Sequence, residues 1–430
     1  MARRRQHKRK PAKQAPLQSA EIRIGEIGAR GDGVANVDGE RVFVPLTAPG
    51  DMARISFRGK RGEIDTILEP SDHRGEPVCG YFGRCGGCAL QHLDAAYYRD
   101  WKRNLVITAL VREGFDENLV APLFSCPSAS RRRASFAVKR TAKGLVFGFN
   151  ARRSAQIVDI DHCPVLAPVF AENLPALRAL AEAAPARWRG FDLAVTFCDN
   201  GLDAALTGGD AEDDLTGPEI LALTDAARAG GVARLTVEGA PVAAFAAPCV
   251  RFGGVPVAVP PGGFLQASRE GEAALSDFVV SHLKGAKHIA DLFSGCGTFS
   301  LPLAKNAAVD AFDTDAPAVA ALDAAARAAG LRHPVKAETR NLFERPLRAE
   351  ELKIYSAAVF DPPRAGAEAQ AAELARSSVP VVVGVSCNPQ SFARDASILR
   401  EGGYRLSQVL PVDQFVFSPH VELAGLFTKG

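Results

Sequence analysis

The chain has 430 residues, of which 47% are hydrophobic and 23% charged, a composition typical of folded proteins with buried cores rather than of disordered chains. At roughly 150 residues per domain, this length suggests about three domains. The net charge is +2, but residues 1–14 hold seven Lys and Arg and no acid, so the remaining 416 residues sum to −5. This excludes a chain that is positively charged throughout, and any contact with nucleic acid must be local.

The chain carries no signal for export or membrane insertion. No stretch approaches the 18 or so apolar residues of a membrane span, and the basic N-terminus lacks the apolar run of a signal peptide. We therefore expect a cytoplasmic protein with no membrane partner. Nine cysteines, an odd number in such a chain, favour metal binding or catalysis over a disulfide framework.

The first 70 residues have two characters. Residues 1–16 predict a disordered basic tail, with an electrostatic tether for RNA or DNA as the alternative. Residues 17–70 alternate short β-rich runs with turns such as Gly31-Asp32-Gly33 and Asp38-Gly39. About five short strands of this kind predict a small β-barrel, a fold that often binds oligonucleotides.

A helix is expected over residues 95–113, and strands dominate from residue 131 to about 207, with a hairpin signal at Asp199-Asn200-Gly201. Within this β-rich middle region, residues 126–153 contain eight Lys and Arg and no acid. Phe136, Phe147 and Phe149 lie among these charges. Cations for phosphates and aromatic faces for bases indicate single-stranded RNA binding, whereas the alternative is an ordinary solvated basic face.

From about residue 286 the pattern becomes strand, loop and helix. Strands are expected at His288–Phe293, Val309–Asp313, Ala357–Phe360 and Pro380–Val385, with helical segments between them. This alternation predicts a doubly wound α/β sheet, in which ligands bind beyond the carboxyl ends of the strands.

The first motif at that edge is Asp291-Leu292-Phe293-Ser294-Gly295-Cys296-Gly297, where a strand turns toward a helix. The glycines allow a ligand to approach the backbone, and Asp313, at the end of the next strand, can accept hydrogen bonds from both ribose hydroxyls. The third glycine of the dinucleotide fingerprint is missing. The motif therefore indicates S-adenosylmethionine rather than NAD.

The second motif is Asp361-Pro362-Pro363-Arg364. Methyltransferases that act on amino groups usually place an aromatic residue after the two prolines, to stack a flipped base. Arg364 occupies that position here, which argues against an exocyclic nitrogen as the target.

The third motif places Cys387 just beyond the strand Val381–Val385. A thiolate there could add to carbon 6 of uracil and so activate carbon 5 toward a methyl sulfonium. Glu422 is the candidate base that removes the carbon 5 proton, and His420 is its competitor because its ordinary pKa is nearer neutrality. The alternative is a buried, inert Cys387.

A group of four cysteines has the spacing Cys79-x5-Cys85-x2-Cys88, with Cys163 later in the chain. Four thiolates can hold an iron–sulfur cluster or a structural zinc, and spacing alone does not separate them. The spacing differs from that of radical enzymes that cleave S-adenosylmethionine. Cys126, Cys198, Cys249 and Cys296 are assigned to packing.

Together these motifs resemble the RNA uracil-5 methyltransferases, from about residue 20 to the C-terminus. The likeness is strongest to members that modify large-subunit ribosomal RNA and have an N-terminal TRAM barrel and a [4Fe-4S] cluster. It implies a TRAM-like barrel at 17–70, an iron–sulfur middle domain at 71–92 and 125–258, and a Rossmann-like methyltransferase domain at 93–124 and 259–430. A monomer that needs no protein partner is expected.

The resemblance also implies roles for individual residues. The cluster ligands would be Cys79, Cys85, Cys88 and Cys163, and the catalytic pair would be Cys387 and Glu422. The cofactor residues would be Gln266, Phe293, Thr298, Asp313, Asn341 and Asp361; Thr298 stands where a relative has Asn, and Asp313 where the family usually has Glu.

The expected function is methylation of carbon 5 of a uridine in 23S ribosomal RNA, with the target base flipped out of its stack. Three alternatives remain: a tRNA uracil-5 methyltransferase, an RNA cytosine-5 methyltransferase, which would share the thiolate chemistry, and a non-catalytic RNA-binding assembly factor.

Overall fold

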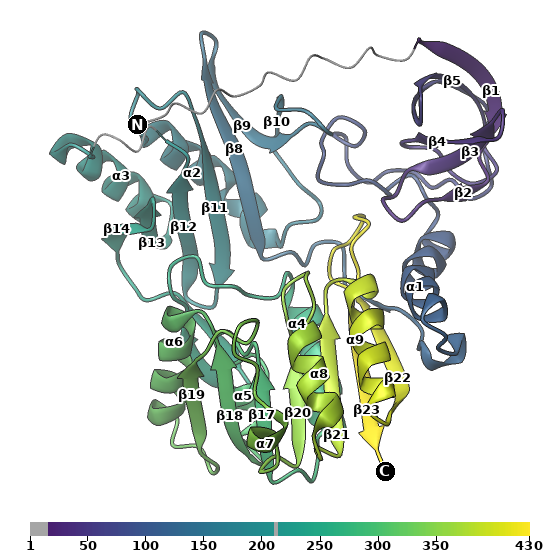
Figure 1. Ribbon diagram of the computed structural model, residues 1–430. Coiled ribbons are helices and arrows are strands. Elements are labelled where there is room, and N and C mark those ends of the chain that lie inside the picture. Colours follow the sequence, from purple (N-terminus) through teal and green to yellow (C-terminus); the bar gives the residue numbers. More distant parts are fainter. Residues whose placement is uncertain (1–15, 210–213) are drawn as a thin grey trace, which may run out of the picture. The chain divides into compact units, whose positions relative to one another are not determined.

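The computed structural model describes residues 16–209 and 214–430 (Figure 1). The predicted basic tail lies outside the described residues, apart from Pro16. The chain divides into two compact units, one formed by Met1–Pro77 and Ala89–Tyr98 and the other by Val78–Cys88 and Arg99–Gly430. No helix in the described part of the chain is long and apolar enough to cross a membrane.

The first unit contains one curled six-stranded sheet, with strand order β1-β5-β6-β4-β3-β2. Its core is formed by apolar side chains that alternate along the strands, such as Ile22, Val44 and Ile55. At Asp38-Gly39, between β3 and β4, both residues have positive φ, as in the tight turns that such pairs favour. The strands are β1 Gln18–Arg23, β2 Glu26–Ile27, β3 Gly33–Val37, β4 Glu40–Val44, β5 Met52–Arg58 and β6 Arg61–Glu69.

The second unit holds two sheets, of which the first has seven strands in the order β10-β9-β8-β11-β12-β13-β14. Apolar residues of α2 and α3 pack with this sheet in one core, among them Leu177 and Leu223. The strands are β8 Arg133–Thr141, β9 Gly144–Asn150, β10 Ile157–Asp159, β11 Gly190–Cys198, β12 Gly201–Thr207, β13 Val232–Val237 and β14 Ala240–Ala244. The helices are α2 Pro168–Ala183 and α3 Gly217–Ala229.

This sheet corrects part of the RNA-binding prediction for residues 126–153. Phe136 and Phe147 are fully buried in the core, where their rings stack with centroids 4.7 Å apart. Arg140 donates hydrogen bonds to the backbone carbonyls of Glu182 and Ala184, just beyond or at the end of α2. These aromatic rings serve packing rather than base stacking, because β8 and β9 turn them toward the helices.

The second sheet of this unit has eight strands in the order β19-β18-β17-β20-β21-β23-β22-β7. The first five of these are parallel to one another, whereas β23 runs antiparallel to both of its neighbours. The strands are β17 His288–Leu292, β18 Ala308–Asp313, β19 Val335–Thr339, β20 Ala357–Phe360, β21 Val381–Ser386, β22 Tyr404–Asp413, β23 Glu422–Lys429 and β7 Phe124–Ser125.

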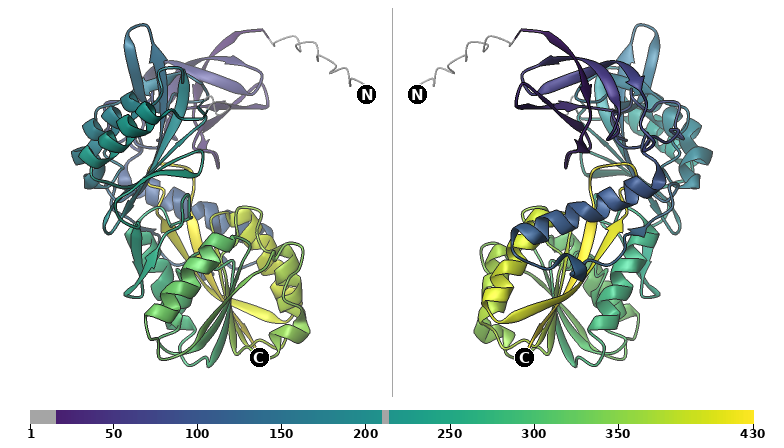
Figure 2. Two further views of the ribbon diagram at one scale, coloured as in Figure 1. Left: turned by 90° about the vertical axis from the view of Figure 1, so that its left-hand side faces the viewer. Right: turned by 90° about the vertical axis from the view of Figure 1, so that its right-hand side faces the viewer.

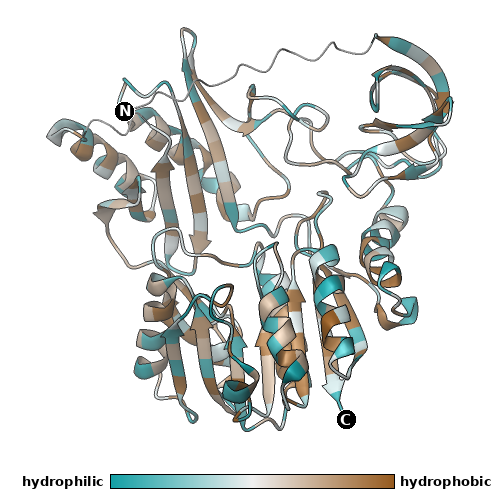
Figure 3. Ribbon diagram, viewed as in Figure 1, coloured by the Kyte–Doolittle hydropathy of each residue, from teal (hydrophilic) through white to brown (hydrophobic). Residues whose placement is uncertain are grey.

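Helices cover both faces of this sheet, as Figure 2 shows. Alternation along β21 explains the two layers, because Val382 packs with α8 and α9 while Val383 and Val385 pack with α4. The inner strands are mainly apolar along their length (Figure 3), as expected for strands that are buried on both faces. The predicted doubly wound α/β methyltransferase fold is therefore observed.

The remaining elements complete the second unit or connect it to the first. They are α1 Ala95–Arg112, the short helix η1 Glu117–Leu119, β15 Cys249–Phe252, β16 Val255–Ala258, α4 Arg269–His282, α5 Ser300–Leu303, α6 Ala316–Ala328, α7 Ala349–Leu352, α8 Glu368–Arg376 and α9 Pro389–Glu401. The β15–β16 hairpin packs against α6.

Candidate active site

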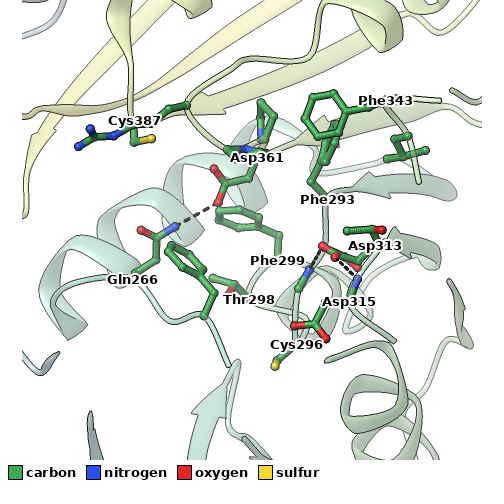
Figure 4. Close-up of a pocket in the computed structure, with 18 of the residues that line it drawn as sticks. Gln266, Phe293, Cys296, Thr298, Phe299, Asp313, Asp315, Phe343, Asp361 and Cys387 are labelled. Atoms are coloured by element: carbon green, nitrogen blue, oxygen red, sulfur yellow. Dashed lines mark hydrogen bonds between the residues drawn. The ribbon is translucent and has the colours of Figure 1, made fainter. Parts of the chain in front are cut away.

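A cavity of about 510 Å³ opens at the carboxyl ends of the parallel strands. It lies where β17, β18, β20 and β21 end, the edge at which α/β sheets bind their ligands. All the predicted cofactor and catalytic residues line it: Gln266, Phe293, Thr298, Asp313, Asn341, Asp361, Cys387 and Glu422. Figure 4 labels six of these, including Gln266, Asp361 and Cys387.

The glycine turn after β17 forms one wall of the cavity. Gly297 has a φ of 94°, and a Cβ there would lie 2.4 Å from Leu322 Cδ1, so a larger residue would be strained and would push the Leu322 side chain aside. Asp313 braces the turn, because its carboxylate accepts hydrogen bonds from Gly295 N–H and Asp315 N–H, each at 2.8 Å. The Gly295 N–H is therefore already bound by the carboxylate of Asp313.

Aromatic rings provide flat apolar surfaces in the cavity. The rings of Phe293 and Phe343 lie 5.4 Å apart between centroids. Phe293 has a φ of 66°, an uncommon conformation for a non-glycine residue. Phe343 is 45% exposed and Phe264 64% exposed, so each has a face available to a planar ligand.

A chain of hydrogen bonds joins the two buried carboxylates. Gln266 Nε2 donates to Asp361 Oδ2 at 3.1 Å, and Gln414 Nε2 donates both to Gln266 Oε1 at 2.6 Å and to Glu422 Oε2 at 2.8 Å. Burial raises the pKa of Glu422 to about 7, although the bond from Gln414 and the charge of Arg364 oppose the rise. Burial and the charge of Glu422 raise the pKa of Asp361 well above its ordinary value.

Cys387 and Glu422 are brought together by the pairing of β21 and β23. Ser386, the last residue of β21, is opposite Leu423, so Cys387 and Glu422 are the next positions across the antiparallel pair. Burial raises the pKa of the Cys387 thiol to about 11, and the charges of Glu422 and Asp361 add to the rise, while Arg364 opposes it. The thiol is therefore protonated at neutral pH.

His420, the competing base, lies at the same cavity. Its Nε2 lies 3.2 Å from an Arg364 guanidinium nitrogen. Burial and the charge of Arg364 lower the pKa of His420, so the ring is neutral at physiological pH. Arg364 always donates, which leaves that ring nitrogen as the acceptor. Glu422 therefore suits the role of base better than His420.

Comparison with known proteins places this site in a family. A family model described as tRNA (uracil-5-)-methyltransferase matches residues 262–430, which form most of the cavity. The 23S rRNA (uracil(1939)-C(5))-methyltransferase RlmD of Chromohalobacter salexigens is 33% identical over 95% of this chain and 89% of its own length. The chain belongs to the RNA uracil-5 methyltransferase family.

Further relatives extend this likeness over almost the whole chain. An uncharacterised RNA methyltransferase of Brucella suis is 46% identical over 96% of this chain and 98% of its own. The crystal structure of the Pyrococcus abyssi tRNA (uracil-54, C5)-methyltransferase with S-adenosyl-L-homocysteine is 25% identical, with a TM-score of 0.71 and coverage of 95% and 99%. As a uracil-5 methyltransferase, the chain is an S-adenosylmethionine-dependent enzyme that acts on RNA.

The cavity fits S-adenosylmethionine. It combines an acid for the ribose, aromatic faces for the adenine and carboxylates near which a sulfonium and an ammonium are favourable. Ser294 Oγ is buried without a hydrogen-bond partner in the described part of the chain, so the cavity retains a polar atom for a ligand to satisfy. Burial raises the pKa of Asp291, beneath the turn, to about 7.

The four cysteines predicted as metal ligands all belong to the second unit and are half-buried. Burial raises the pKa of Cys163, backbone N–H groups of Val165 and Leu166 oppose the rise, and the thiolates of Cys79 and Cys85 add to it. Burial lowers the pKa of the Arg131 guanidinium, while the thiolates of Cys163 and Cys88 oppose that change. Each of the four cysteines therefore interacts electrostatically with another of them or with Arg131.

The metal prediction is nevertheless not confirmed. Within residues 16–209 and 214–430, no group of three or more His, Cys, Asp and Glu side chains is arranged to hold a metal ion. The chemistry of the donor set still fits an iron–sulfur cluster, because Gly87 N–H donates to Cys85 Sγ at 3.4 Å, a type of bond that supports cluster sulfur. Of the cysteines assigned to packing, Cys126, Cys198 and Cys296 are buried and Cys249 is half-buried.

Some functional residues of this uracil-5 methyltransferase were missed in the sequence. Phe264 directly follows the turn signal Pro260-Pro261-Gly262-Gly263, whereas no comparable signal adjoins Phe343 or Gln414. Only the fold brings these residues to the cavity or to its hydrogen-bond chain. Lys102 is also missed. It is fully buried and donates to Asp413 Oδ1 at 2.7 Å and to the backbone carbonyls of Phe415 and His420.

Proposed function

We propose that the enzyme methylates carbon 5 of a uridine in 23S ribosomal RNA through a covalent bond between Cys387 and carbon 6. The observation that carries the proposal is the placement of Cys387 opposite Glu422 in the cavity that holds the cofactor residues. S-adenosylmethionine supplies an electrophilic methyl group there. The other steps need groups of the chain itself: a nucleophile, an acceptor for the proton of that nucleophile, and a base for the carbon 5 proton.

In this mechanism the Cys387 sulfur adds to carbon 6 and its proton passes to a neighbouring carboxylate, because the thiol is protonated at rest. The electron pair of the carbon 5–carbon 6 double bond moves to carbon 5, which takes the methyl group. Glu422 removes the carbon 5 proton, the double bond re-forms, and the sulfur leaves as a thiolate. A pKa of about 7 suits Glu422 to this task near neutral pH.

The ribosomal substrate is supported by the relative from Chromohalobacter salexigens, which covers 95% of this chain. The relative from Pyrococcus abyssi acts on tRNA, and that substrate is the second candidate. Incubation with labelled S-adenosylmethionine and either 23S rRNA or tRNA, followed by nucleoside digestion, separates the two. We expect 5-methyluridine in 23S rRNA; 5-methylcytidine, or label in tRNA alone, would contradict the proposal.

The covalent step has its own test. RNA with 5-fluorouridine at the target should form a stable adduct with the enzyme, because no base can remove fluorine from carbon 5. Cys387→Ser should abolish adduct and methylation while leaving S-adenosyl-L-homocysteine binding intact. Cys249→Ser is the matched control, since Cys249 is also half-buried but lies outside the cavity. An adduct that persists in Cys387→Ser would refute the proposed nucleophile.

We also propose that Cys79, Cys85, Cys88 and Cys163 bind a [4Fe-4S] cluster. The support is the chemistry of the donor set and the electrostatic interactions among Cys79, Cys85 and Cys163. After anaerobic reconstitution, metal and sulfide analysis should find about four irons per chain. Cys85→Ser should lower the iron content and Cys249→Ser should not. Zinc without sulfide would contradict the cluster.

A further inference from the structure

Three successive arginines precede or begin β8, and they do not share one environment. Arg132 is 2% exposed, donates a hydrogen bond to the Gln266 carbonyl and forms an ion pair with Glu272. Side chains alternate along an extended chain, so Arg131 and Arg133 point to the opposite side. There they line a second cavity of about 340 Å³. Arg132 therefore stabilises the fold, whereas Arg131 and Arg133 line the second cavity.

The second cavity adjoins the active site. Phe264, Gln266 and Phe415 line both cavities, so a strand of RNA with one base in the active site has the second cavity beside it. Its other polar lining includes Ser135 and Thr196. Both cavities belong to the second unit of the chain.

The two arginines carry positive charge that no described carboxylate balances, although Cys163 and Cys88 interact electrostatically with Arg131. In the described part of the chain, neither Arg131 nor Arg133 has a carboxylate within ion-pair distance. Arg131 Nε donates to the Arg133 carbonyl at 3.0 Å, and Arg133 donates to the Leu265 carbonyl at 2.9 Å. These bonds leave other guanidinium N–H groups available, and an anion between two half-buried cations would relieve their repulsion.

Aromatic rings accompany the charges. The Arg133 guanidinium lies 5.5 Å from the centre of the Phe264 ring, and that of Arg131 lies 5.9 Å from the Phe415 ring. Phe264 remains 64% exposed, so part of its ring surface is open to a further contact. An arginine fork beside an open aromatic face is the combination that binds a phosphate and stacks a base.

We propose that the second cavity binds the nucleotide next to the target uridine, with its phosphate between Arg131 and Arg133 and its base against Phe264. This inference rests on the proposed function, because it assigns the neighbour of the base that is methylated. It also restores the RNA contact predicted for the basic segment, but through these two arginines and a phenylalanine outside that segment.

The test measures binding of a fluorescent oligouridylate of about ten nucleotides to the full-length protein. Arg131→Gln and Arg133→Gln should each weaken binding about tenfold and reduce the slope of log affinity against log salt by about 0.7. Phe264→Leu should weaken binding without changing the slope, since it removes stacking but no charge. Arg405→Gln, an exposed position at the opposite end of β22, is the control and should change neither.

The outcomes separate this inference from the proposed function. If wild-type protein forms no 5-methyluridine in RNA, the proposed function fails whatever the variants bind. If it does, but both glutamine variants bind oligouridylate with wild-type affinity and slope, the second cavity is not an RNA site. Calorimetric binding of S-adenosyl-L-homocysteine reports whether each variant is folded. If a variant is not folded, the test uses wild-type protein instead and compares ordinary oligouridylate with oligouridylate whose linkages are uncharged methylphosphonates. Equal binding of these two RNAs by the wild-type protein overturns the proposal.

Discussion

Gln414 holds Glu422 in place by donating a hydrogen bond from Nε2 to Glu422 Oε2 at 2.8 Å. The orientation of the Gln414 amide is fixed, because its Oε1 accepts a hydrogen bond from Ala267 N–H at 2.8 Å. The bond stabilises the ionised form of Glu422 and so limits the rise in pKa that burial causes. Gln414 is therefore a positioning residue that also tunes the proposed base.

Replacing Gln414 with leucine should shift the pH dependence of catalysis. Without the donor, the pKa of Glu422 rises further above about 7, and the base is ionised only at higher pH. We expect the acid limb of the kcat profile to move upward by about one pH unit, so that activity falls about fivefold at pH 7 and recovers near pH 9. Single-turnover methylation measured across pH gives the position of the acid limb.

Gln408→Leu, on the exposed side of β22, is the control and should not move the acid limb. A loss of activity in Gln414→Leu that is independent of pH would contradict the effect of Gln414 on the pKa of Glu422.

Replacing Glu422 with glutamine should stabilise the fold at alkaline pH while removing activity. The native pKa of about 7 exceeds the ordinary value of 4.5, so folding binds a proton. The stabilisation is present below pH 4.5 and is lost as the pH rises through 7. Glu422→Gln removes this dependence and should be more stable than wild type by on the order of 3 kcal/mol at pH 8, with little difference at pH 4.

Urea unfolding at the two pH values measures this difference in the free energy of unfolding. Glu401→Gln, at the exposed end of α9, should show no such change. If the difference in stability between the variant and wild type were the same at both pH values, folding would not raise the pKa of Glu422.

The same Glu422→Gln change should make Cys387 more reactive. The charge of Glu422 adds to the burial that raises the pKa of Cys387 to about 11. A neutral side chain removes that contribution, lowers the pKa and increases the thiolate fraction. We expect iodoacetamide to alkylate Cys387 about three- to tenfold faster at pH 9 in the variant. Mass spectrometry of the peptide that contains Cys387 measures the rate, and an unchanged rate would place Glu422 too far from the sulfur to act.

The sequence predicts the site well where chemistry coincides with strand ends. Asp313, Asp361 and Cys387 follow or end apolar runs, and parallel strands bring such positions to one edge. The sequence predicts poorly where contacts cross between distant segments. Nothing near Gln414 indicates that it meets Gln266, which lies 148 residues away in the chain.

The sequence also did not show which aromatic side chains are buried. Phe136 and Phe147 lie in a segment rich in Lys and Arg, a composition shared by nucleic-acid platforms and by strands with one buried face. Helices α2 and α3 cover the face that holds them, and that cover comes from residues up to about 90 positions later. The helix expected after Gly297 is likewise reduced to the four residues of α5, since the preceding segment forms turns around the cavity.

Phe343→Ala should weaken cofactor binding without harming stability. Phe343 is 45% exposed and contributes a ring face to the cavity beside Phe293, so its loss costs contact with a bound adenine but little core packing. We expect S-adenosyl-L-homocysteine to bind about tenfold more weakly by calorimetry, with the free energy of unfolding within about 0.5 kcal/mol of wild type. Phe245→Ala, 42% exposed and outside the cavity, is the matched control. Unchanged binding in Phe343→Ala would show that the adenine lies elsewhere.

Lys102→Met should destabilise the loop that carries His420 and leads to Glu422. Lys102 and Asp413 form a fully buried ion pair at 2.7 Å, and the same ammonium binds the carbonyls of Phe415 and His420. Removing one member of a buried pair typically costs about 3–5 kcal/mol, because the other charge remains buried. The double variant Lys102→Met/Asp413→Leu removes both charges and should recover much of that loss in urea unfolding. It should not recover methylation rate, since the loop carbonyls still lack their donor. Equal instability of the single and double variants would show that the cost lies in lost packing rather than in the uncompensated charge.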